Sequence, residues 1–212
     1  MPLTSQDHDL LLADPALRWC LDADKPGFEA RARPWLAQTL AFQADERGRW
    51  LGTGADADRA VGWLSQIDTD ADAGAPTDAG AVTQADAAAA DADTDGLTEQ
   101  ERRLDALLES LTEIAGDEAV ERFYAYAEAV DGLQPELPCH ALSSIAVARP
   151  EAVAALIAAA LVEVKACTGS HGLFAETADP ILAAALEAAG GEPGGQVWTA
   201  ELVVRSFWWP AD

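Results

Sequence analysis

The apolar positions in the second half of the chain recur with a helical period. Thr98 and Glu101 form a capping box, T-x-x-E, which is a common start of a helix. Gly116 ends this helix, and a second amphipathic stretch follows as far as Val130. The apolar positions of the first helix are Leu104, Leu107, Leu108, Leu111 and Ile114. The pattern predicts a helical hairpin.

Two further helices are predicted nearer the end of the chain. Pro150 begins a stretch in which apolar residues follow the i, i+3, i+4, i+7 pattern as far as Val164, with alanine over much of the rest. We expect this helix to be the buried centre of the fold. Asp179 and Pro180 begin another helix, which continues to Ala189.

The first part of the chain also reads as mostly helical. Asp14 and Pro15 match an N-cap followed by proline at the first helical position. A longer helix is predicted over residues 28–46, broken or restarted at Pro34. A short helix is predicted over residues 58–66.

Only the C-terminal part shows the alternation of a strand. Residues 196–208 place Trp198, Leu202 and Val204 on one face, although a helix from Thr199 would also group apolar residues. A lone strand cannot satisfy its backbone hydrogen bonds, so it needs a partner in residues 141–147 or in another chain. The predicted fold class is therefore mainly α, with helical bundle-like segments and a C-terminal β-strand.

A low-complexity stretch at residues 68–96 divides the chain. It contains eight aspartates and eleven alanines, and neither a basic nor an aromatic residue. Such a composition cannot bury enough apolar surface to offset the entropy of ordering, so we expect a disordered acidic linker. The predicted organisation is a Trp-rich helical segment at 1–67, the linker at 68–96 and a helical domain with a C-terminal strand at 97–212, and we expect the two segments to pack on each other.

The charge of the chain is strongly negative, with 13 basic and 37 acidic residues and a net charge of −24. A charge of this size strains the compact state by self-repulsion, which molar salt screens. Many aspartates, few lysines and abundant alanine favour a salt-adapted, halophilic protein over the alternative of a GC-rich bacterial one. Strong acidity argues against binding nucleic acid or an anionic membrane surface.

The expected location is the cytoplasm. The first twenty residues carry acids and lack a basic start ahead of an apolar run, so no signal peptide is expected. The longest apolar stretch, 152–162, is well below the roughly 20 residues that cross a bilayer. Three cysteines form no even disulfide framework, which favours reduced thiols.

One group of residues has ligand types suited to a metal. Cys139 and His140 lie in one loop-like stretch, and Cys167 and His171 lie in another. Together they would make a Cys2His2 zinc site, although the spacing departs from the usual ligand pairs. The alternative is that the cysteines are buried and the histidines lie in turns.

Basic and aromatic residues form a second candidate site, a docking surface for a protein partner. Arginines alternate with tryptophans near the N-terminus, and two tryptophans lie close to the C-terminus. Tryptophan and arginine often anchor interfaces. The candidates are Arg31, Arg33, Trp35, Arg47, Arg49, Trp50, Trp208 and Trp209. The alternatives are ordinary salt bridges for the arginines and burial for the C-terminal tryptophans.

The functional hypothesis is an adaptor or regulatory protein that acts by protein–protein interaction. Neither a nucleophile elbow nor a calcium loop is present, and the pairing of Ser170 with His171 does not match a catalytic signature, so we lean against an enzyme. The first alternative is a small zinc-binding protein or metalloenzyme that uses the cysteine and histidine group. The second is an acidic mimic of nucleic acid that occupies a basic cleft.

Overall fold

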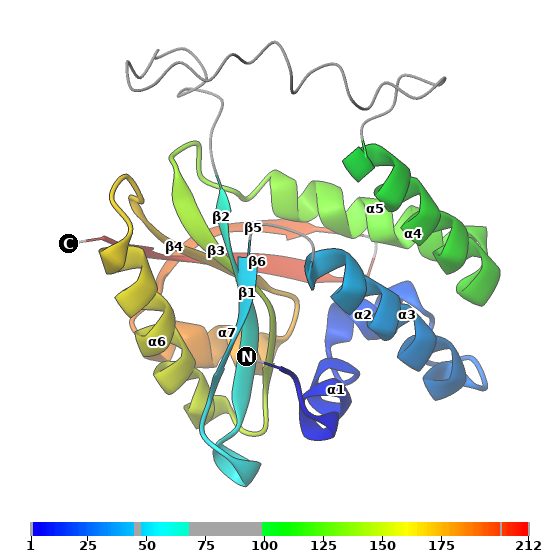
Figure 1. Cartoon of the computed structure of the whole chain (residues 1–212), viewed down its shortest axis with the longest axis horizontal. Helices are drawn as coiled ribbons and strands as arrows, with labels where there is room; N and C mark the ends of the chain where they lie inside the picture. Colours follow the sequence, from blue (N-terminus) through cyan, green and yellow to red (C-terminus); the bar gives the residue numbers. More distant parts are fainter. Residues whose placement is uncertain (1, 45–47, 68–98, 200, 212) are drawn as a thin grey trace.

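The computed structural model describes residues 2–44, 48–67, 99–199 and 201–211. In these ranges a six-stranded mixed sheet lies between two layers of helices (Figure 1). The strands are β1 (Gly48–Thr53), β2 (Ala60–Ile67), β3 (Cys139–Val147), β4 (Gly172–Thr177), β5 (Glu192–Trp198) and β6 (Val203–Pro210). The helices are α1 (Ser5–Leu11), α2 (Pro15–Cys20), α3 (Phe28–Ala44), α4 (Glu99–Ala115), α5 (Asp117–Asp131), α6 (Val153–Ala166) and α7 (Pro180–Ala188).

The expectation of a mainly helical, bundle-like fold is wrong, because the centre of the molecule is this sheet. The clearest error concerns residues 58–66, which were expected to form a short helix but belong largely to β2. Both faces of β2 are covered: Ala60 and Leu64 join the core on one side, and Val61 joins the core on the other. A strand buried on both faces loses the polar–apolar alternation that identifies strands in a sequence.

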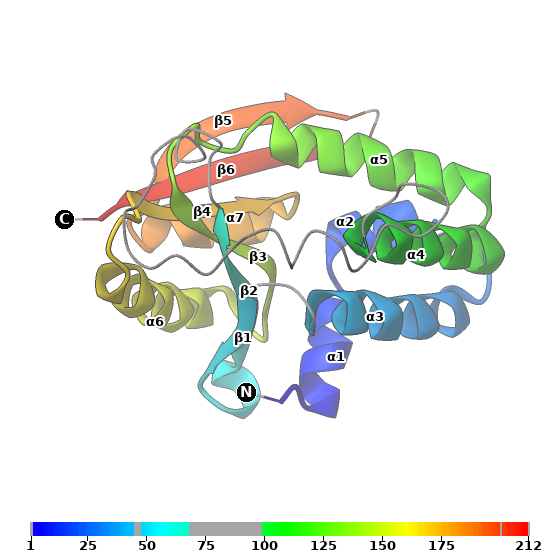
Figure 2. The same cartoon turned by 45° about the horizontal axis from the view of Figure 1, so that its top comes forward.

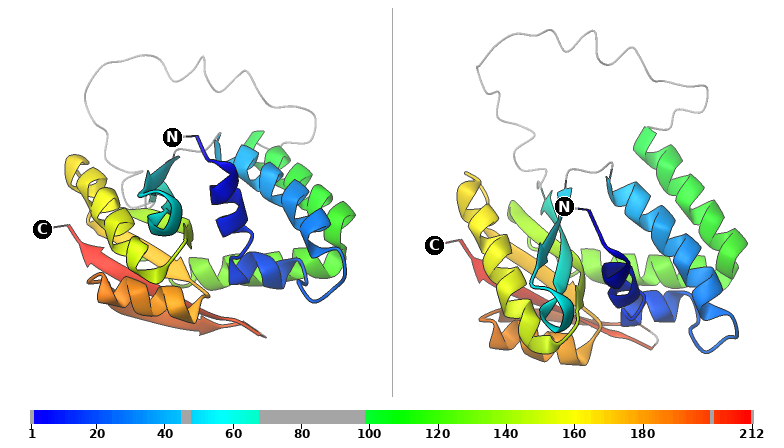
Figure 3. Two further views of the ribbon diagram at one scale, coloured as in Figure 1. Left: turned by 90° about the horizontal axis from the view of Figure 1, so that it is seen from below. Right: turned by 60° about the horizontal axis from the view of Figure 1, so that its bottom comes forward.

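The two helical layers are unequal. Helices α6 and α7 cover one face of the sheet, and α1 to α5 lie on the other (Figures 2 and 3). The core on the α6 side is formed by aliphatic residues together with Phe207 and one tryptophan. Its members include Leu64, Leu142, Leu156, Leu173 and Trp209. The core on the other side joins Leu11, Trp35 and Leu111, which come from three different helices, to the sheet.

The strand order is β1-β2-β3-β4-β6-β5, and one pairing differs from all the others. β3 and β4 run parallel, joined by α6, while the remaining neighbours in the described sheet are antiparallel. Their register covers only three pairs and ends at Leu142 with Ala175, although both strands continue beyond it. The sheet is therefore open on the carboxyl side of this pair.

A local irregularity lies where that pairing stops. The register between β2 and β3 shifts between Val61 and Trp63, which is the mark of a β-bulge. Ser144, in the bulged part of β3, has a φ of 49°, a left-handed conformation that non-glycine residues seldom adopt. The bulge turns β3 at the point where it leaves β4.

The sequences on both sides of residues 68–96 contribute to the same sheet. β2 ends at Ile67 and pairs along its length with β3, which begins at Cys139. The expectation that the two segments pack on each other is therefore confirmed for the described parts. The predicted linker itself lies outside the described residues, and the proposed domain boundaries stay a prediction.

The helices in the second half are confirmed: the hairpin is α4 and α5, and the two later helices are α6 and α7. In the first half, α2 begins at Pro15 as expected, but α3 continues through Pro34. The C-terminal alternation corresponds to a hairpin of two strands, β5 and β6. The partners of β6 are β4 and β5, not residues 141–147, which belong to β3.

A buried ion pair attaches the N-terminal helix to the sheet. Asp7 on α1 is fully buried and accepts two hydrogen bonds from Arg59, at 2.7 and 2.9 Å. Arg59 directly precedes β2, so this pair joins α1 to the start of that strand. The neighbouring guanidinium lowers the pKa of Asp7 from 3.8 to about 2, against the opposing effect of burial.

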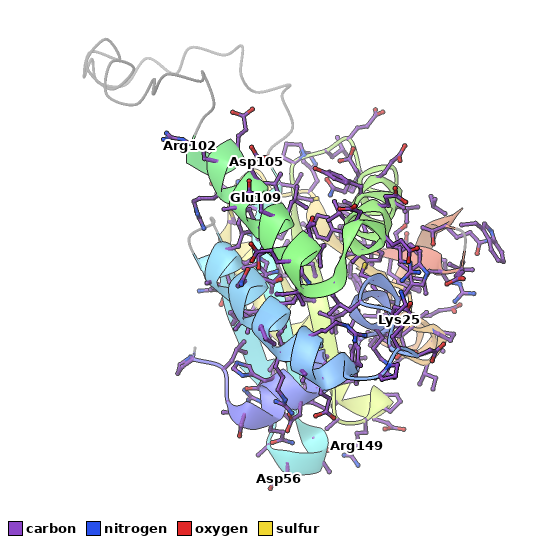
Figure 4. All side chains as sticks on the ribbon, turned by 90° about the vertical axis from the view of Figure 1, so that its right-hand side faces the viewer. Lys25, Asp56, Arg102, Asp105, Glu109 and Arg149 are labelled. Atoms are coloured by element: carbon purple, nitrogen blue, oxygen red, sulfur yellow. The ribbon has the colours of Figure 1, made fainter. Side chains whose placement is uncertain are left out.

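Charged side chains lie mainly on the outside of the helical layer. Asp105 and Glu109 are exposed along α4, and Lys25 lies beyond the end of α2, where it contacts Asp22 and Glu118 (Figure 4). Within the described ranges, no helix combines the length and the apolar character needed to cross a membrane.

Candidate functional site

A cavity of about 320 Å³ lies between the helical layer of α1 to α5 and the open part of the sheet. β3 supplies Ser143, Ser144 and Ile145 to its wall, and β4 supplies Glu176 and Thr177. The rest of the lining is mostly apolar and aromatic. It comprises Leu11, Asp14, Ala16, Leu17, Cys20, Trp35, Leu36, Thr39, Leu40, Phe42, Gln43, Trp50, Leu104, Leu107, Phe123 and Tyr126.

The position of the cavity follows from the strand arrangement. Residues of β3 and β4 beyond Leu142 and Ala175 no longer pair with each other, and these are the residues that reach the cavity. In α/β sheets, ligands commonly bind beyond the carboxyl ends of parallel strands, where neighbouring connections diverge. The bulge and the unusual φ of Ser144 lie in the same wall, and such features concentrate at functional sites.

Two carboxyl groups reach this largely apolar space. Glu176 comes from the last part of β4 and is 8% exposed. Burial raises its pKa from 4.5 to about 8, and the charge of Asp14 acts in the same direction. Asp14 is the N-cap of α2, where its Oδ1 accepts a hydrogen bond of 2.9 Å from the backbone N–H of Leu17. Burial also raises the pKa of Asp14, with a smaller contribution from Asp179.

A phenol and a thiol lie close to these acids. Burial raises the pKa of Tyr126 well above 10, and the charges of Glu176 and Asp14 add to the effect. Burial raises the pKa of Cys20 to about 12, again with a contribution from Asp14. At neutral pH both groups are protonated and neutral. The described side chains that line the cavity include neither lysine, arginine nor histidine, so a cation bound there meets no competing positive charge in the wall.

A polar pair lies elsewhere in the same wall. Gln43 is in the last turn of α3, and its Nε2 donates a hydrogen bond of 3.3 Å to Oγ of Ser144. Oε1 of Gln43 is buried and accepts a hydrogen bond from none of the described residues. Buried amide oxygens are usually paired, so this atom is a second polar feature of the cavity.

The four candidate zinc ligands are divided between the faces of the sheet. Cys139 is fully buried beside Ala141 and Phe174, where burial raises its pKa to about 11. The next residue is His140, whose Nδ1 lies 2.9 Å from Oγ of Ser170. His140 and Cys167 line the same surface groove. His171 begins the approach to β4, where its backbone N–H donates to the carbonyl of Pro138. Across the described part of the chain, no three His, Cys, Asp or Glu side chains form a group that could hold a metal ion.

Most of the candidate partner-binding tryptophans pack in the hydrophobic clusters of the protein. Trp35 and Trp209 belong to the two main cores and are 3% and 5% exposed. Trp208 packs against the small cluster around Cys139, which agrees with the alternative of burial. Trp50 makes an edge-to-face contact with Trp63, with the ring centroids 5.6 Å apart, and it also lines the cavity.

The candidate arginines are spread over several elements. Arg31 donates hydrogen bonds to the carbonyls of Leu21 and Asp22 at 3.1 and 3.0 Å. Arg33 pairs with Asp9 and Glu29, and Arg49 on β1 pairs with Glu163 on α6. Arg47 lies outside the described residues. These contacts agree with the ordinary salt-bridge alternative and do not gather the described arginines into one patch.

The sequence reasoning missed the cavity acids and the polar pair. Asp14 was recognised only as a helix cap, which it is, and Glu176 received no role. The available signal was an acid at the end of an apolar run, Gly172–Thr177, whose six residues are all buried. Searches against family models and against curated proteins find no match for this chain.

Proposed function

We propose that this protein binds a small organic amine in the cavity, with the carboxyl of Glu176 as the partner of the nitrogen. The observation that carries the proposal is the lining itself: a buried carboxyl, Glu176, and a half-buried one, Asp14, in a largely apolar space, with no basic side chain among the described lining residues. A carboxyl in such a space is neutral on its own, and a bound cation is the partner that would stabilise its ionised form.

The electrostatics of Glu176 support this ligand class. Without a cation, burial keeps the carboxyl protonated up to a pH of about 8. An ammonium group within hydrogen-bond distance favours the ionised carboxylate and lowers its pKa. Binding of a protonated amine therefore releases the proton of Glu176 and forms an ion pair in a low-dielectric site.

The remainder of the wall suits the organic part of such a ligand. Trp35, Leu36 and Phe123 present apolar surface, and the aromatic rings are also favourable neighbours of a cation. A cavity of about 320 Å³ is within the range of ordinary small-molecule sites. Leu104 and Leu107 of α4 add apolar wall opposite the sheet.

Isothermal titration calorimetry at pH 8.5 in molar KCl tests the proposal with n-hexylamine and 1-hexanol, which differ only in the polar group. We expect the amine to bind at least about tenfold more tightly than the alcohol, because the ion pair forms only with the amine. Glu176→Gln removes the charge while keeping the shape, and this variant should lose that difference.

Glu128→Gln is the matched control, since Glu128 is an exposed acid on α5, the helix that carries Tyr126. It should leave both affinities unchanged. If wild-type protein binds the amine no better than the alcohol, or if Glu176→Gln keeps the full preference, the proposal is wrong.

The salt-adapted character and the cytoplasmic location expected from composition are retained in this proposal. The adaptor hypothesis stays a prediction. The described residues proposed for it make contacts inside the protein, and Arg47 lies outside the described ranges.

A further inference from the structure

Gln43 and Ser144 form a second polar group in the wall of the cavity, in addition to the carboxyl groups. Gln43 comes from α3 and Ser144 from the bulge in β3, whereas Glu176 and Asp14 come from β4 and α2. Polar groups from four elements therefore line the cavity, together with apolar residues such as Leu36 and Leu40.

The orientation of the Gln43 amide is set by one hydrogen bond. Its Nε2 donates to Oγ of Ser144 at 3.3 Å, and Ser144 has a left-handed φ of 49° in the bulge of β3. With the nitrogen engaged on β3, Oε1 is buried and has no hydrogen-bond donor among the described residues. Because a buried carbonyl oxygen without a donor is destabilising, it marks a place where a donor is missing.

We infer that the ligand carries a hydrogen-bond donor in addition to its amine, and that Gln43 recognises this donor through Oε1. The inference rests on the proposed amine site and adds a specificity residue to it. The ligand class becomes a bifunctional amine, an amino alcohol or an amine with a second N–H group. Gln43 selects this class over simple alkylamines because a plain hydrocarbon leaves Oε1 unpaired.

Calorimetry with two matched series measures the selection. Linear amino alcohols of increasing chain length are each compared with the n-alkylamine that has the same number of non-hydrogen atoms. We expect at least one chain length at which the hydroxyl improves the affinity about tenfold, which corresponds to one hydrogen bond to a buried acceptor. A methoxyalkylamine of that length cannot donate a hydrogen bond and should lose the improvement.

Gln43→Met keeps the length of the side chain and removes the acceptor. In this variant the amino alcohol and the alkylamine should bind equally, and urea unfolding followed by circular dichroism shows independently that the variant is folded. Gln38→Met is the control, because Gln38 is exposed on the same helix. It should preserve the preference for the amino alcohol.

The results separate this inference from the proposed function. If no amine of either series binds, the proposed amine site is wrong. If alkylamines bind through Glu176 but no chain length favours the hydroxyl, or Gln43→Met keeps the preference, or the methoxy compound binds as well as the hydroxyl compound, the role given to Gln43 is wrong and the amine site stands.

Discussion

Replacing Glu176 by glutamine should stabilise the protein, and the gain should grow with pH. The folded state binds the Glu176 proton up to a pH of about 8, whereas the unfolded chain releases it near 4.5. Between these values the unfolded state holds fewer protons, so this carboxyl lowers the free energy of unfolding as pH rises. Glutamine has a similar shape and no charge, and it removes this dependence.

The magnitude follows from the shift of the pKa. Each unit corresponds to 1.36 kcal/mol, so the 2.5 units between 4.5 and pH 7 give about 3 kcal/mol, and the full shift to about 8 gives about 5 kcal/mol. The difference between Glu176→Gln and wild type should therefore be small at pH 5, about 3 kcal/mol at pH 7 and constant above pH 8. Any change in packing or hydrogen bonding adds a contribution that does not vary with pH.

Urea unfolding followed by circular dichroism in molar KCl measures these differences at pH 5, 7 and 8.5. Comparison with wild type at each pH cancels the titration of the other acids, and Glu128→Gln, which makes the same replacement at an exposed position of α5, provides the control. A difference that is independent of pH, or that shrinks as pH rises, would refute the assignment of Glu176 as a carboxyl held neutral by burial.

Three further outcomes are expected. Asp7→Asn should lower the free energy of unfolding by about 2 kcal/mol at pH 7, because the pKa of Asp7 is depressed from 3.8 to about 2; urea titrations should show this loss vanish as pH falls through that interval, and a loss that persists at pH 2 would contradict it. The affinity for n-hexylamine should rise about tenfold per pH unit below a pH of about 8 and then level off, as calorimetry can test; a flat profile would exclude coupling to the Glu176 proton. The melting temperature should rise from dilute buffer to molar KCl, since screening relieves the net charge of −24; a calorimetric scan without such a rise would remove the argument for salt adaptation.

The sequence predicts the outer helices well and the sheet poorly, for a physical reason. α4, α5 and α6 each have an exposed face, so their period of 3.6 is visible in the sequence. β2 is covered on both faces, and its apolar run over residues 60–64 resembles a buried helix segment. β1 contains glycines at positions 48 and 52, and its sequence does not indicate a strand because glycine is more typical of turns.

The candidate site could not be found from local patterns because its parts come from distant places in the chain. Asp14 caps a helix near the N-terminus, and Glu176 lies in the last part of β4, more than 160 residues later in the sequence. In a chain with 37 acids, no single carboxyl attracts notice before the fold shows which ones are buried. The bulge at Ser144 also has no sequence mark, since serine rarely adopts a left-handed conformation.

The pairing of β2 with β3 has a consequence for how this chain tolerates insertions. The two strands are neighbours in the sheet, although residues 68–138 separate them in the sequence. In the unfolded state, the entropy of bringing two strands together depends on the logarithm of the number of residues between them, so doubling that number costs about 0.6 kcal/mol. An insertion between Ile67 and α4 is therefore expected to cost little stability, as long as β2 and β3 remain in register.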